Sequence, residues 1–240
     1  DRDRIVDMVY RGYAEKYDSW IYAEDPMHDP NLPQYDYNPD KANKILEKTG
    51  YIDIDGDGIR EDPATGEDLA FELLSPDDVD MVKMATLVSE ALPEIGISID
   101  IKVVDWDTFY DIVYYPEDDS YEIAVSSESP APSPYADWIW LEAKGWGASG
   151  DGTEWNSSYW NNPRFNELID LLGTATSMEE RRAYEYEMQE LMAEELPYAS
   201  LVRPQSIDAY RTDKFEGWEN EIGGPIGWMN PWSILNLHLK

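Results

Sequence analysis

The fold class is decided by residues 69–115, LAFELLSPDDVDMVKMATLVSEALPEIGISIDIKVVDWDTFYDIVYY, together with residues 121–127, YEIAVSS. Three parts of this stretch are typical of strands: 69–75, the alternating part 97–104, and 121–127. Between them, apolar residues recur at helical spacing over 77–92 and again after Asp105, which can cap the second helix. Strand, helix, strand, helix and strand in this order predict an α/β fold whose sheet strands are joined by crossover helices.

Further elements are expected on both sides of this stretch. Helical patterns cover residues 1–14, 39–49, 163–173 and 178–196, and strand patterns cover residues 198–204 and 206–210. Ser177 followed by Glu180 predicts a capping box at the start of the last of these helices. No internal repeat and no low-complexity linker divides the sequence, so we expect one compact α/β unit.

The chain is strongly acidic. Its 240 residues include 51 Asp and Glu against 18 Lys and Arg, which gives a formal charge of −33. A chain with this balance cannot assemble the basic face that binds nucleic acid. The acidic residues are spread along the whole chain, which favours a solvated shell and adaptation to high salt, where self-repulsion is screened. An acidic protein kept soluble by its charge in ordinary salt is the alternative.

Cysteine is absent, and the only histidines are His28 and His238. The composition therefore excludes disulfides, thiolate nucleophiles and cysteine metal sites, and it makes a Ser-His-Asp triad a poor hypothesis. No run of about 18 apolar residues predicts a membrane-spanning helix. No signal-peptide pattern precedes the first helical pattern.

A short aspartate-rich motif, DIDGDG at residues 53–58, matches the opening of a calcium-binding loop of the EF-hand type. Its alternating carboxylates are Asp53, Asp55 and Asp57. The match then degrades, because the twelfth position is Ala64 and not glutamate, so Glu61 or Asp62 would have to complete the shell. A polar turn whose aspartates accept backbone hydrogen bonds is the equal alternative. If calcium is bound, we expect its role to be structural.

Residues 127–163 lack clear periodicity and are rich in proline, serine, glycine and aromatic residues. Loops of this length inside compact domains are usually functional or disordered, and the aromatic content argues against disorder. Aromatic side chains in such loops often stack on a ligand. The set in which we expect ligand-facing members is Trp138, Trp140, Trp146, Trp155, Tyr159 and Trp160. Glycoside hydrolysis by a pair of carboxylates stays an open hypothesis, although 51 acidic residues make any single pair uninformative.

Six segments of the chain occur together in a specific order. They are DRDRIVDMVYRGYA (1–14), YNPDKANKILEKTGYIDIDGDGIRE (37–61), residues 71–104, YEIAVSS with the following PAP (121–132), WNSSYWNNPRFNELIDLL (155–172) and SMEERRAYEYEMQELMAEELPYASL (177–201). In this order they resemble the C-terminal lobe of the extracellular solute-binding proteins of peptide-type ABC importers, the oligopeptide, dipeptide and nickel-binding family. The resemblance extends over nearly the whole chain.

This resemblance implies a periplasmic-binding-protein-like lobe with a mixed, mainly parallel sheet flanked by helices. Residues 1–240 would form a single C-terminal lobe, with the N-terminal lobe and the export signal outside this sequence. The implied function is capture of a peptide or related small solute between two lobes, and its delivery to an ABC permease in the membrane, with no bond broken. The resemblance also implies an extracellular, lipid-anchored protein without a catalytic cofactor, which we expect to be a monomer.

The aromatic loop and the resemblance together point to a set of ligand-contacting residues. They are Ser127, Glu128, Ser129, Trp138, Trp155, Asn156 and Tyr159. The chain departs from the family at residues 130–132, where PAP replaces an Asp-containing segment that can pair with a peptide amino terminus, leaving Glu128 or Asp137 as substitutes. Tryptophan also stacks on sugars, so an oligosaccharide-binding member stays open. A carbohydrate-active enzyme domain and a calcium-stabilised interaction module are the alternatives from other classes.

Overall fold

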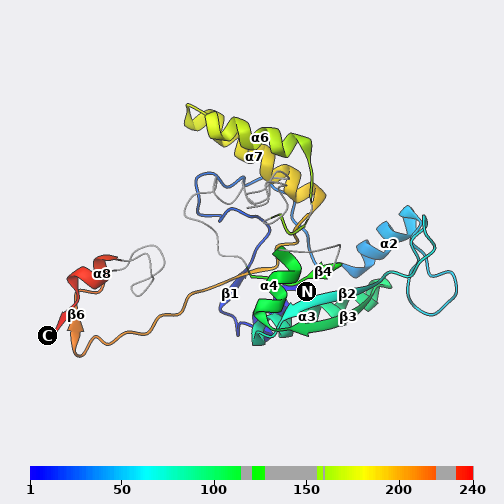
Figure 1. Cartoon of the computed structure of the whole chain (residues 1–240), viewed down its shortest axis with the longest axis horizontal. Coiled ribbons are helices and arrows are strands. Elements are labelled where there is room, and N and C mark those ends of the chain that lie inside the picture. The colour runs from blue at the N-terminus through cyan, green and yellow to red at the C-terminus, as the bar shows by residue number, and fades with distance from the viewer. Residues whose placement is uncertain (115–120, 128–155, 159, 220–230, 240) are drawn as a thin grey trace.

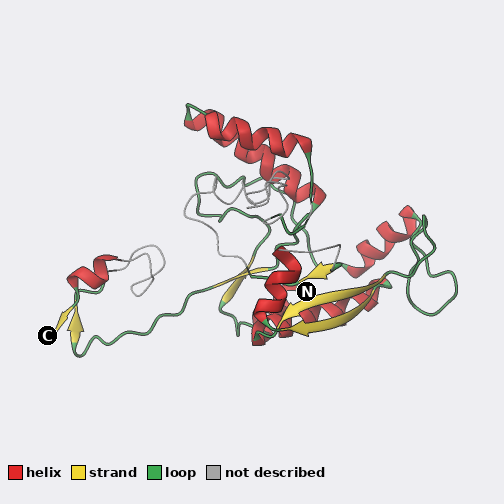
Figure 2. Cartoon of the chain, viewed as in Figure 1, coloured by secondary structure: helices red, strands yellow, loops and turns green. Residues whose placement is uncertain are grey.

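The structure is a computed structural model that describes residues 1–114, 121–127, 156–158, 160–219 and 231–239 (Figure 1). A parallel sheet with helices on its faces forms one part of it, and a helical hairpin and an extended C-terminal segment form two others (Figure 2). Within the described ranges, no helix combines the length and the apolar character needed to cross a membrane.

The central sheet has the strand order β3-β2-β4 in the described part of the chain. β2 (Ala70–Pro76) runs parallel to β3 (Ser98–Val104), in continuous register along both strands. β4 (Ile123–Ala124) pairs with the other edge of β2, also in parallel. Each connection includes a crossover helix, as parallel pairing requires.

Two helices cover opposite faces of this sheet. Leu73 and Leu74 are neighbours on β2, so their side chains point to opposite faces. Leu73 packs with buried residues of α3 (Val79–Ala91), whereas Leu74 packs with Phe109 of α4 (Trp106–Tyr114). The sheet therefore has an apolar core on each side.

The N-terminal elements pack beside α3. α1 (Arg2–Met8) places Ile5 in the same apolar cluster as the α3 core. The chain continues into β1 (Ala14–Lys16), which pairs antiparallel with β5 (Val202–Pro204). Strands that are far apart in the sequence are thereby joined beside the sheet.

A helix and a projecting loop precede the sheet in the chain. α2 (Pro39–Thr49) begins with proline in its first turn and ends at Gly50, whose φ of 96° is the left-handed conformation that favours glycine. Residues 51–69 form the aspartate-rich loop, and Figure 1 shows this loop projecting beyond α2. A short 3₁₀ helix, η1 (Leu92–Ile95), follows α3 and precedes β3.

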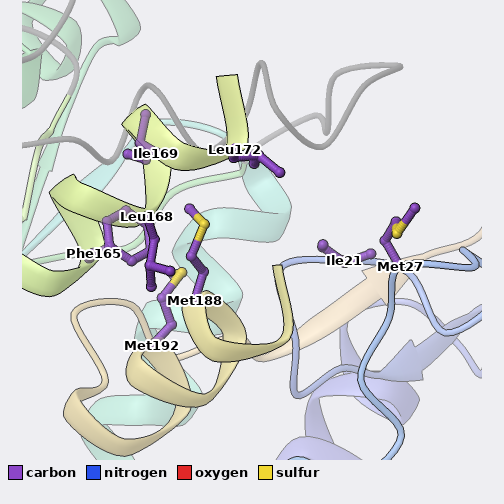
Figure 3. Close-up of a cluster of buried hydrophobic side chains, with 8 residues drawn as sticks. All are labelled: Ile21, Met27, Phe165, Leu168, Ile169, Leu172, Met188 and Met192. Atoms are coloured by element: carbon purple, nitrogen blue, oxygen red, sulfur yellow. The ribbon is translucent and has the colours of Figure 1, made fainter. Parts of the chain in front are cut away.

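α6 (Pro163–Thr174) and α7 (Met178–Glu195) form the helical hairpin. Their shared core contains apolar side chains from both helices and two from a segment that lies far away in the sequence. The buried residues are Phe165, Leu168, Ile169, Leu172, Met188 and Met192 of the helices, with Ile21 and Met27 of the distant segment (Figure 3). The predicted capping box of Ser177 and Glu180 is confirmed at the start of α7.

The C-terminal arm, residues 205–239, contains three short elements in its described part. They are β6 (Phe215–Glu216), α8 (Pro231–Asn236) and β7 (His238–Leu239), and the two strands pair antiparallel. Figure 1 shows the arm leading away from the sheet and the hairpin. Ile207 and Leu239 are exposed along it.

The α/β fold class is confirmed, and four element predictions need correction. The strand predicted over 198–204 contains only Val202–Pro204. The helix predicted over 1–14 ends at Met8, because the chain turns where Arg11 has a φ of 55° and Gly12 a φ of 83°. The strand predicted over 121–127 contains only Ile123–Ala124. Residues 206–210 are not a strand, since alternating apolar residues form a strand only where a partner strand accepts them.

Candidate functional site

The three parallel strands end at a common edge of the sheet, and open α/β sheets bind ligands in the crevice at this edge. The loops concerned follow Pro76, Val104 and Ala124. Ser127, one of the predicted ligand contacts, comes shortly after β4 and is exposed. Its position therefore agrees with the place where this fold class holds a ligand, and the contact itself stays a prediction.

Two carboxylates at this edge are occupied by helix capping. Asp78 accepts hydrogen bonds from the N–H groups of Asp80 at 2.9 Å and Met81 at 3.1 Å. Asp105 accepts from the Thr108 N–H at 3.0 Å and from the Thr108 hydroxyl at 2.8 Å, and these bonds lower the pKa of Asp105. These carboxylates order the loops at the sheet edge by fixing the first turns of α3 and α4.

An exposed apolar patch that the sequence analysis did not identify lies beside the same edge. Val103, Trp106 and Tyr110 are 47%, 42% and 39% exposed, although α4 buries Phe109 and Val113. Trp106 and Tyr110 are four residues apart and so share one face of the helix. Both rings lie on the same side of α4 as its buried residues, with the Trp106 ring 5.6 Å from that of Phe109 and the Tyr110 ring 4.5 Å from that of Tyr114. The patch offers aromatic surface close to the end of β3.

Five of the predicted ligand contacts lie outside the described residues. They are Glu128, Ser129, Trp138, Trp155 and Tyr159. Trp140 and Trp146 of the aromatic set also lie outside them. The contacts of these side chains with a ligand stay predictions from the sequence.

Asn156 is described, and it is only 3% exposed. Its Nδ2 donates to the Trp160 carbonyl at 2.6 Å, and its Oδ1 accepts from the Ser158 hydroxyl at 3.0 Å. These bonds shape the loop in which Asn156 lies. Contact of Asn156 with a ligand stays a prediction. The ligand would have to bind the remaining amide hydrogen on Nδ2 or the remaining lone pair on Oδ1.

Two tyrosines anchor this loop to the rest of the molecule. The Tyr121 hydroxyl, just before β4, donates to the Ser157 carbonyl. Tyr198 follows α7, and its hydroxyl accepts from the Ser158 N–H at 3.2 Å. The described part of the aromatic region is therefore tied both to the sheet and to the end of the hairpin.

Glu195, at the end of α7, holds the next part of the same loop. It accepts hydrogen bonds from Trp160 Nε1 at 2.6 Å and from Asn162 Nδ2 at 2.7 Å. The Trp160 ring lies edge-on to Phe165, with ring centroids 4.6 Å apart. Trp160, a member of the predicted aromatic set, is therefore packed against the hairpin core.

A cavity of about 250 Å³ is lined by α7 and the residues that follow it, by residues 18–37 and by the first two residues of the chain. Its walls are largely apolar and aromatic, and an ion pair between Arg2 and Asp18 lies at its edge. The residues that give the walls this character include Trp20, Leu32, Tyr35, Met192 and Tyr198. This cavity could not be predicted from the sequence, because its walls come from separate parts of the chain.

The aspartate-rich loop brings three carboxylates together. Asp53, Asp55 and Glu61 each offer one oxygen atom, and these atoms lie within 4.8 Å of one another. Of the two residues expected to complete the shell, Glu61 is therefore the one that joins the set. Asp57, which the sequence analysis included, does not join it, and its carboxylate accepts the Ile59 N–H at 2.8 Å.

The donor set suits a hard cation, because calcium prefers carboxylate oxygens. Asp53 is held in place by the N–H groups of Gly56 at 2.6 Å and Gly58 at 3.0 Å, and Glu61 is only 7% exposed. Desolvation and the surrounding carboxylates raise the pKa of Asp68, which indicates a negative potential that a cation would relieve. Backbone hydrogen bonds to the aspartates equally satisfy the alternative of a polar turn. Calcium binding at this loop stays a prediction.

Arg60 fixes the base of this loop. Its guanidinium donates to the carbonyls of Ile95 at 2.9 Å and Tyr51 at 2.6 Å, and to Oδ1 of Asn43 at 2.8 Å. Gly96 lies directly against it with a φ of 76°, and a Cβ at this position would come within 2.7 Å of the Arg60 side chain. The loop is thus attached to α2 and η1 by protein groups alone.

Comparison with protein families gives the class of protein. Residues 1–147 match the family described as bacterial extracellular solute-binding proteins, family 5, middle region. This match covers more than half of the chain, so the chain belongs to this family of extracellular solute-binding proteins. The family binds solutes and is not enzymatic, which removes the carbohydrate-active enzyme from the alternatives.

Among curated proteins, the chain is similar to the oligopeptide-binding protein AppA of Bacillus subtilis (strain 168). The two are 26% identical over 230 residues, which is 91% of this chain and 39% of AppA. The chain therefore spans less than half the length of this curated relative.

Solved structures of such proteins share the fold of this chain. AppA in complex with a nonapeptide has a TM-score of 0.76 and 21% identity, over 100% of this chain and 45% of that chain. A mannohexaose-bound oligopeptide-binding protein of Thermotoga maritima has a TM-score of 0.77 and 19% identity, over 100% and 47%. NikZ of Campylobacter jejuni with Ni(L-His) has a TM-score of 0.77 and 18% identity, over 99% and 46%. These likenesses confirm the α/β lobe.

Proposed function

We propose that this chain is the C-terminal lobe of the solute-binding component of an ABC importer, and that it holds a peptide against a second lobe. One observation carries the proposal: the whole chain superposes on less than half of AppA in its nonapeptide complex. If this chain is one lobe of a two-lobed protein about twice as long, it is expected to match about half of AppA. The C-terminal arm, with its exposed Ile207 and Leu239, would then pack against the second lobe.

The sheet edge supports this placement of the solute. The loops after β2, β3 and β4 meet there, and the capped aspartates Asp78 and Asp105 fix two of them. Trp106 and Tyr110 add exposed aromatic surface beside it. Closure of the second lobe would bury the solute, and only a higher affinity of the closed form for the solute favours that form.

A peptide is the ligand that we infer for this chain. The nonapeptide complex of AppA, which is also the curated relative, supports this choice. An oligosaccharide is the second candidate, because a similar fold holds mannohexaose and because the chain carries a tryptophan-rich loop. Both ligands can stack on aromatic rings, whereas they differ in mass and in hydrogen-bonding groups.

Native mass spectrometry of the full-length protein purified from its own host tests this proposal. Peptide masses released on unfolding would support it, and a ladder of hexose units would replace the peptide by a sugar. If no ligand is released, calorimetric titration with mixed nonapeptides and with mannohexaose follows. Absence of binding to either would contradict the proposal.

Tryptophan variants of the full-length protein test the predicted contacts. We expect Trp138→Ala and Trp155→Ala to weaken binding of the identified ligand about tenfold or more, since buried aromatic anchors dominate such interfaces. Trp218→Ala is the matched control, because the Trp218 ring lies against Tyr210 in the C-terminal arm, 4.9 Å between centroids. If all three variants bind the ligand with the affinity of the parent protein, Trp138 and Trp155 do not contact the ligand.

We further propose that the full-length protein is a lipid-anchored monomer at the cell surface that delivers its solute to a membrane permease. The extracellular family supports the location, and the anchor and the permease are expectations from the resemblance. Salt adaptation is likewise a prediction from the charge of −33. Detergent partitioning tests the anchor, and thermal unfolding in rising concentrations of KCl tests the adaptation.

Calcium in the aspartate-rich loop is tested separately. Isothermal titration with calcium at low and at high salt is expected to give a saturable heat, and Glu61→Gln is expected to abolish it, because Glu61 joins Asp53 and Asp55. Glu67→Gln is the control, as it removes the same charge from an exposed position of this loop. Heat no greater than that of dilution would establish the polar-turn alternative.

A further inference from the structure

Glu185 lies in the middle of α7 and has no solvent exposure. Its Oε1 accepts a hydrogen bond from Arg181 Nε at 3.2 Å, one turn earlier on the same helix. Its Oε2 accepts no hydrogen bond from the described residues. A buried carboxylate with one unpaired oxygen is costly, and this cost disappears when the carboxyl is protonated.

The region of α7 around Glu185 is covered by a segment without helix or strand. This docking segment, residues 19–32, contributes Ile21 and Met27 to the hairpin core, where Met188 lies beside them in the same cluster. Figure 3 shows Ile21 and Met27 on a separate stretch of chain that approaches α7. The docking segment therefore depends on α7 for its place.

Gln189, one turn after Glu185, makes the polar attachment between the two. Its Oε1 accepts from the Ser19 hydroxyl at 3.3 Å and from the Asp29 N–H at 3.1 Å. Its Nε2 donates to the Met27 carbonyl at 2.8 Å and to the Glu185 carbonyl at 3.0 Å. The attachment point of the docking segment is therefore directly bonded to the backbone of Glu185.

The charges around Glu185 come from both sides of this contact. Burial has the largest effect on Glu185 and raises its pKa above the ordinary value of 4.5, whereas Arg181 of α7 lowers this pKa and Asp25 of the docking segment raises it further. Asp29 of the same segment is also buried, where it accepts hydrogen bonds from Asn31. Ionised Glu185 would thus be repelled by the Asp25 carboxylate of the docking segment.

We propose that Glu185 makes the attachment of the docking segment to α7 dependent on pH, with the neutral carboxyl holding the segment in place and ionisation releasing it. The docked state binds the proton more tightly than the released state, so its stability is fully present below the ordinary pKa. It is lost as pH rises from that value through the raised pKa. Ser19 and Leu32 of the segment line the cavity beside α7, so release also opens this cavity.

Hydrogen exchange of the chain between about pH 4 and pH 8 tests the proposal, with rates corrected for the intrinsic effect of pH. The reporter is the Asp29 N–H, which is bonded to Gln189. Within the window between the two pKa values, its corrected exchange is expected to rise roughly tenfold per pH unit. In Glu185→Gln this rise is expected to be absent, while backbone amides of β2 keep their protection in both proteins.

Glu190→Gln is the matched control, because Glu190 is exposed on the same helix and its change removes the same charge. It is expected to keep the pH dependence of the parent chain. A corrected exchange rate of Asp29 that does not change with pH in the parent chain would overturn the proposal, and so would the same rise in Glu185→Gln. Should Glu185→Gln fail to fold, Glu185→Met, which removes the polar group altogether, serves as the second variant under the same criteria.

Discussion

The sheet unit, residues 70–127, and the helical hairpin α6–α7 both bury apolar cores, but they are held together in different ways. In the sheet unit, a continuous parallel ladder joins β2 to β3, and α3 and α4 between the strands supply the cores. The hairpin completes its core with Ile21 and Met27, which lie far earlier in the chain and pair with no strand. Its long-range order depends on side chains, chiefly Gln189.

This difference indicates that a single substitution changes the attachment of the docking segment more readily than it changes strand pairing in the sheet unit. A ladder distributes its hydrogen bonds over many backbone groups, so one side chain changes packing but not pairing. The docking segment shares few partners with α7, so one side chain decides its attachment. A single substitution should therefore detach the docking segment from the hairpin more easily than it separates the strands of the sheet unit.

The largest effect is expected from Phe165→Ala, because Phe165 has no exposure and belongs to the hairpin core. We expect a loss of about 4 kcal/mol in the free energy of unfolding, measured by urea titration. Hydrogen exchange is expected to locate this loss in α6, α7 and the docking segment. Leu73→Ala, a similar truncation in β2, is expected to act on the sheet unit instead. If both variants lower protection equally throughout the chain, the two regions unfold as one and the comparison fails.

An intermediate effect is expected from Gln189→Leu, which keeps an apolar side chain of similar size but removes four hydrogen bonds. Because the buried Asp29 N–H and the Met27 carbonyl lose their partner, we expect a loss of about 2 to 3 kcal/mol. Exchange of the Asp29 amide should rise while that of α6 stays unchanged. Glu190→Leu, on the exposed side of α7, provides the control. An unchanged Asp29 amide would show that apolar contacts alone hold the segment.

The smallest effect is expected from Ser177→Ala, which removes the cap of α7 and half of its capping box. The expected loss is about 1 kcal/mol, and it should appear as faster exchange in the first turn of α7 only. Ser89→Ala removes a helical hydroxyl that bonds the Thr86 carbonyl without capping anything, so its loss should be smaller. If Ser89→Ala lowers the free energy of unfolding more than Ser177→Ala does, the cap of α7 does not contribute the expected stability.

The same cap predicts a pH dependence. Hydrogen bonds from the N–H and hydroxyl groups of Thr176 and Ser177 lower the pKa of Glu180. The stability that Glu180 contributes is therefore present above its ordinary value of 4.5 and is lost as pH falls through the lowered pKa. NMR titration of the Glu180 carboxyl should give a pKa closer to 4.5 in Ser177→Ala, because one of the bonds to the ionised form is lost.

Local patterns predicted the helices up to α7, and for those after the first they also predicted the ends closely, whereas the helix predicted over 1–14 ends at Met8. Residues 39–49 are helical as the proline at the start and Gly50 after the end predict, and Asp105 and Ser177 cap the helices that they were expected to cap. These signals are reliable because the cap and its partner lie within one helical turn. The parallel pairing of the sheet followed from a different signal, the alternation of strands and helices along the chain.

Features built from distant residues could not be found in this way. Glu185 follows Arg181 by four residues, which is the spacing of an exposed ion pair on a helix, and only the packing of the folded chain shows that its side chain has no exposure. The hydrogen bonds of Asn156 to partners two and four residues away in its own loop could not be predicted from its side-chain chemistry, and its contact with a ligand stays a prediction. A side chain's chemistry states what it can bind, whereas the packing of the rest of the chain decides what it does bind.

The contact between Arg60 and Gly96, and the hydrogen bonds of the Arg60 guanidinium, limit how the aspartate-rich loop can be reused in protein engineering. A transplant of residues 53–61 into another scaffold would carry the carboxylates but leave behind the three acceptors that the guanidinium requires. Lysine could not substitute, since a single ammonium group cannot reproduce the planar fork that reaches all of them. A transplant that is to keep its shape therefore needs the loop together with α2, which carries Asn43, and with η1 and Gly96, and a loop moved without them should lack a defined conformation.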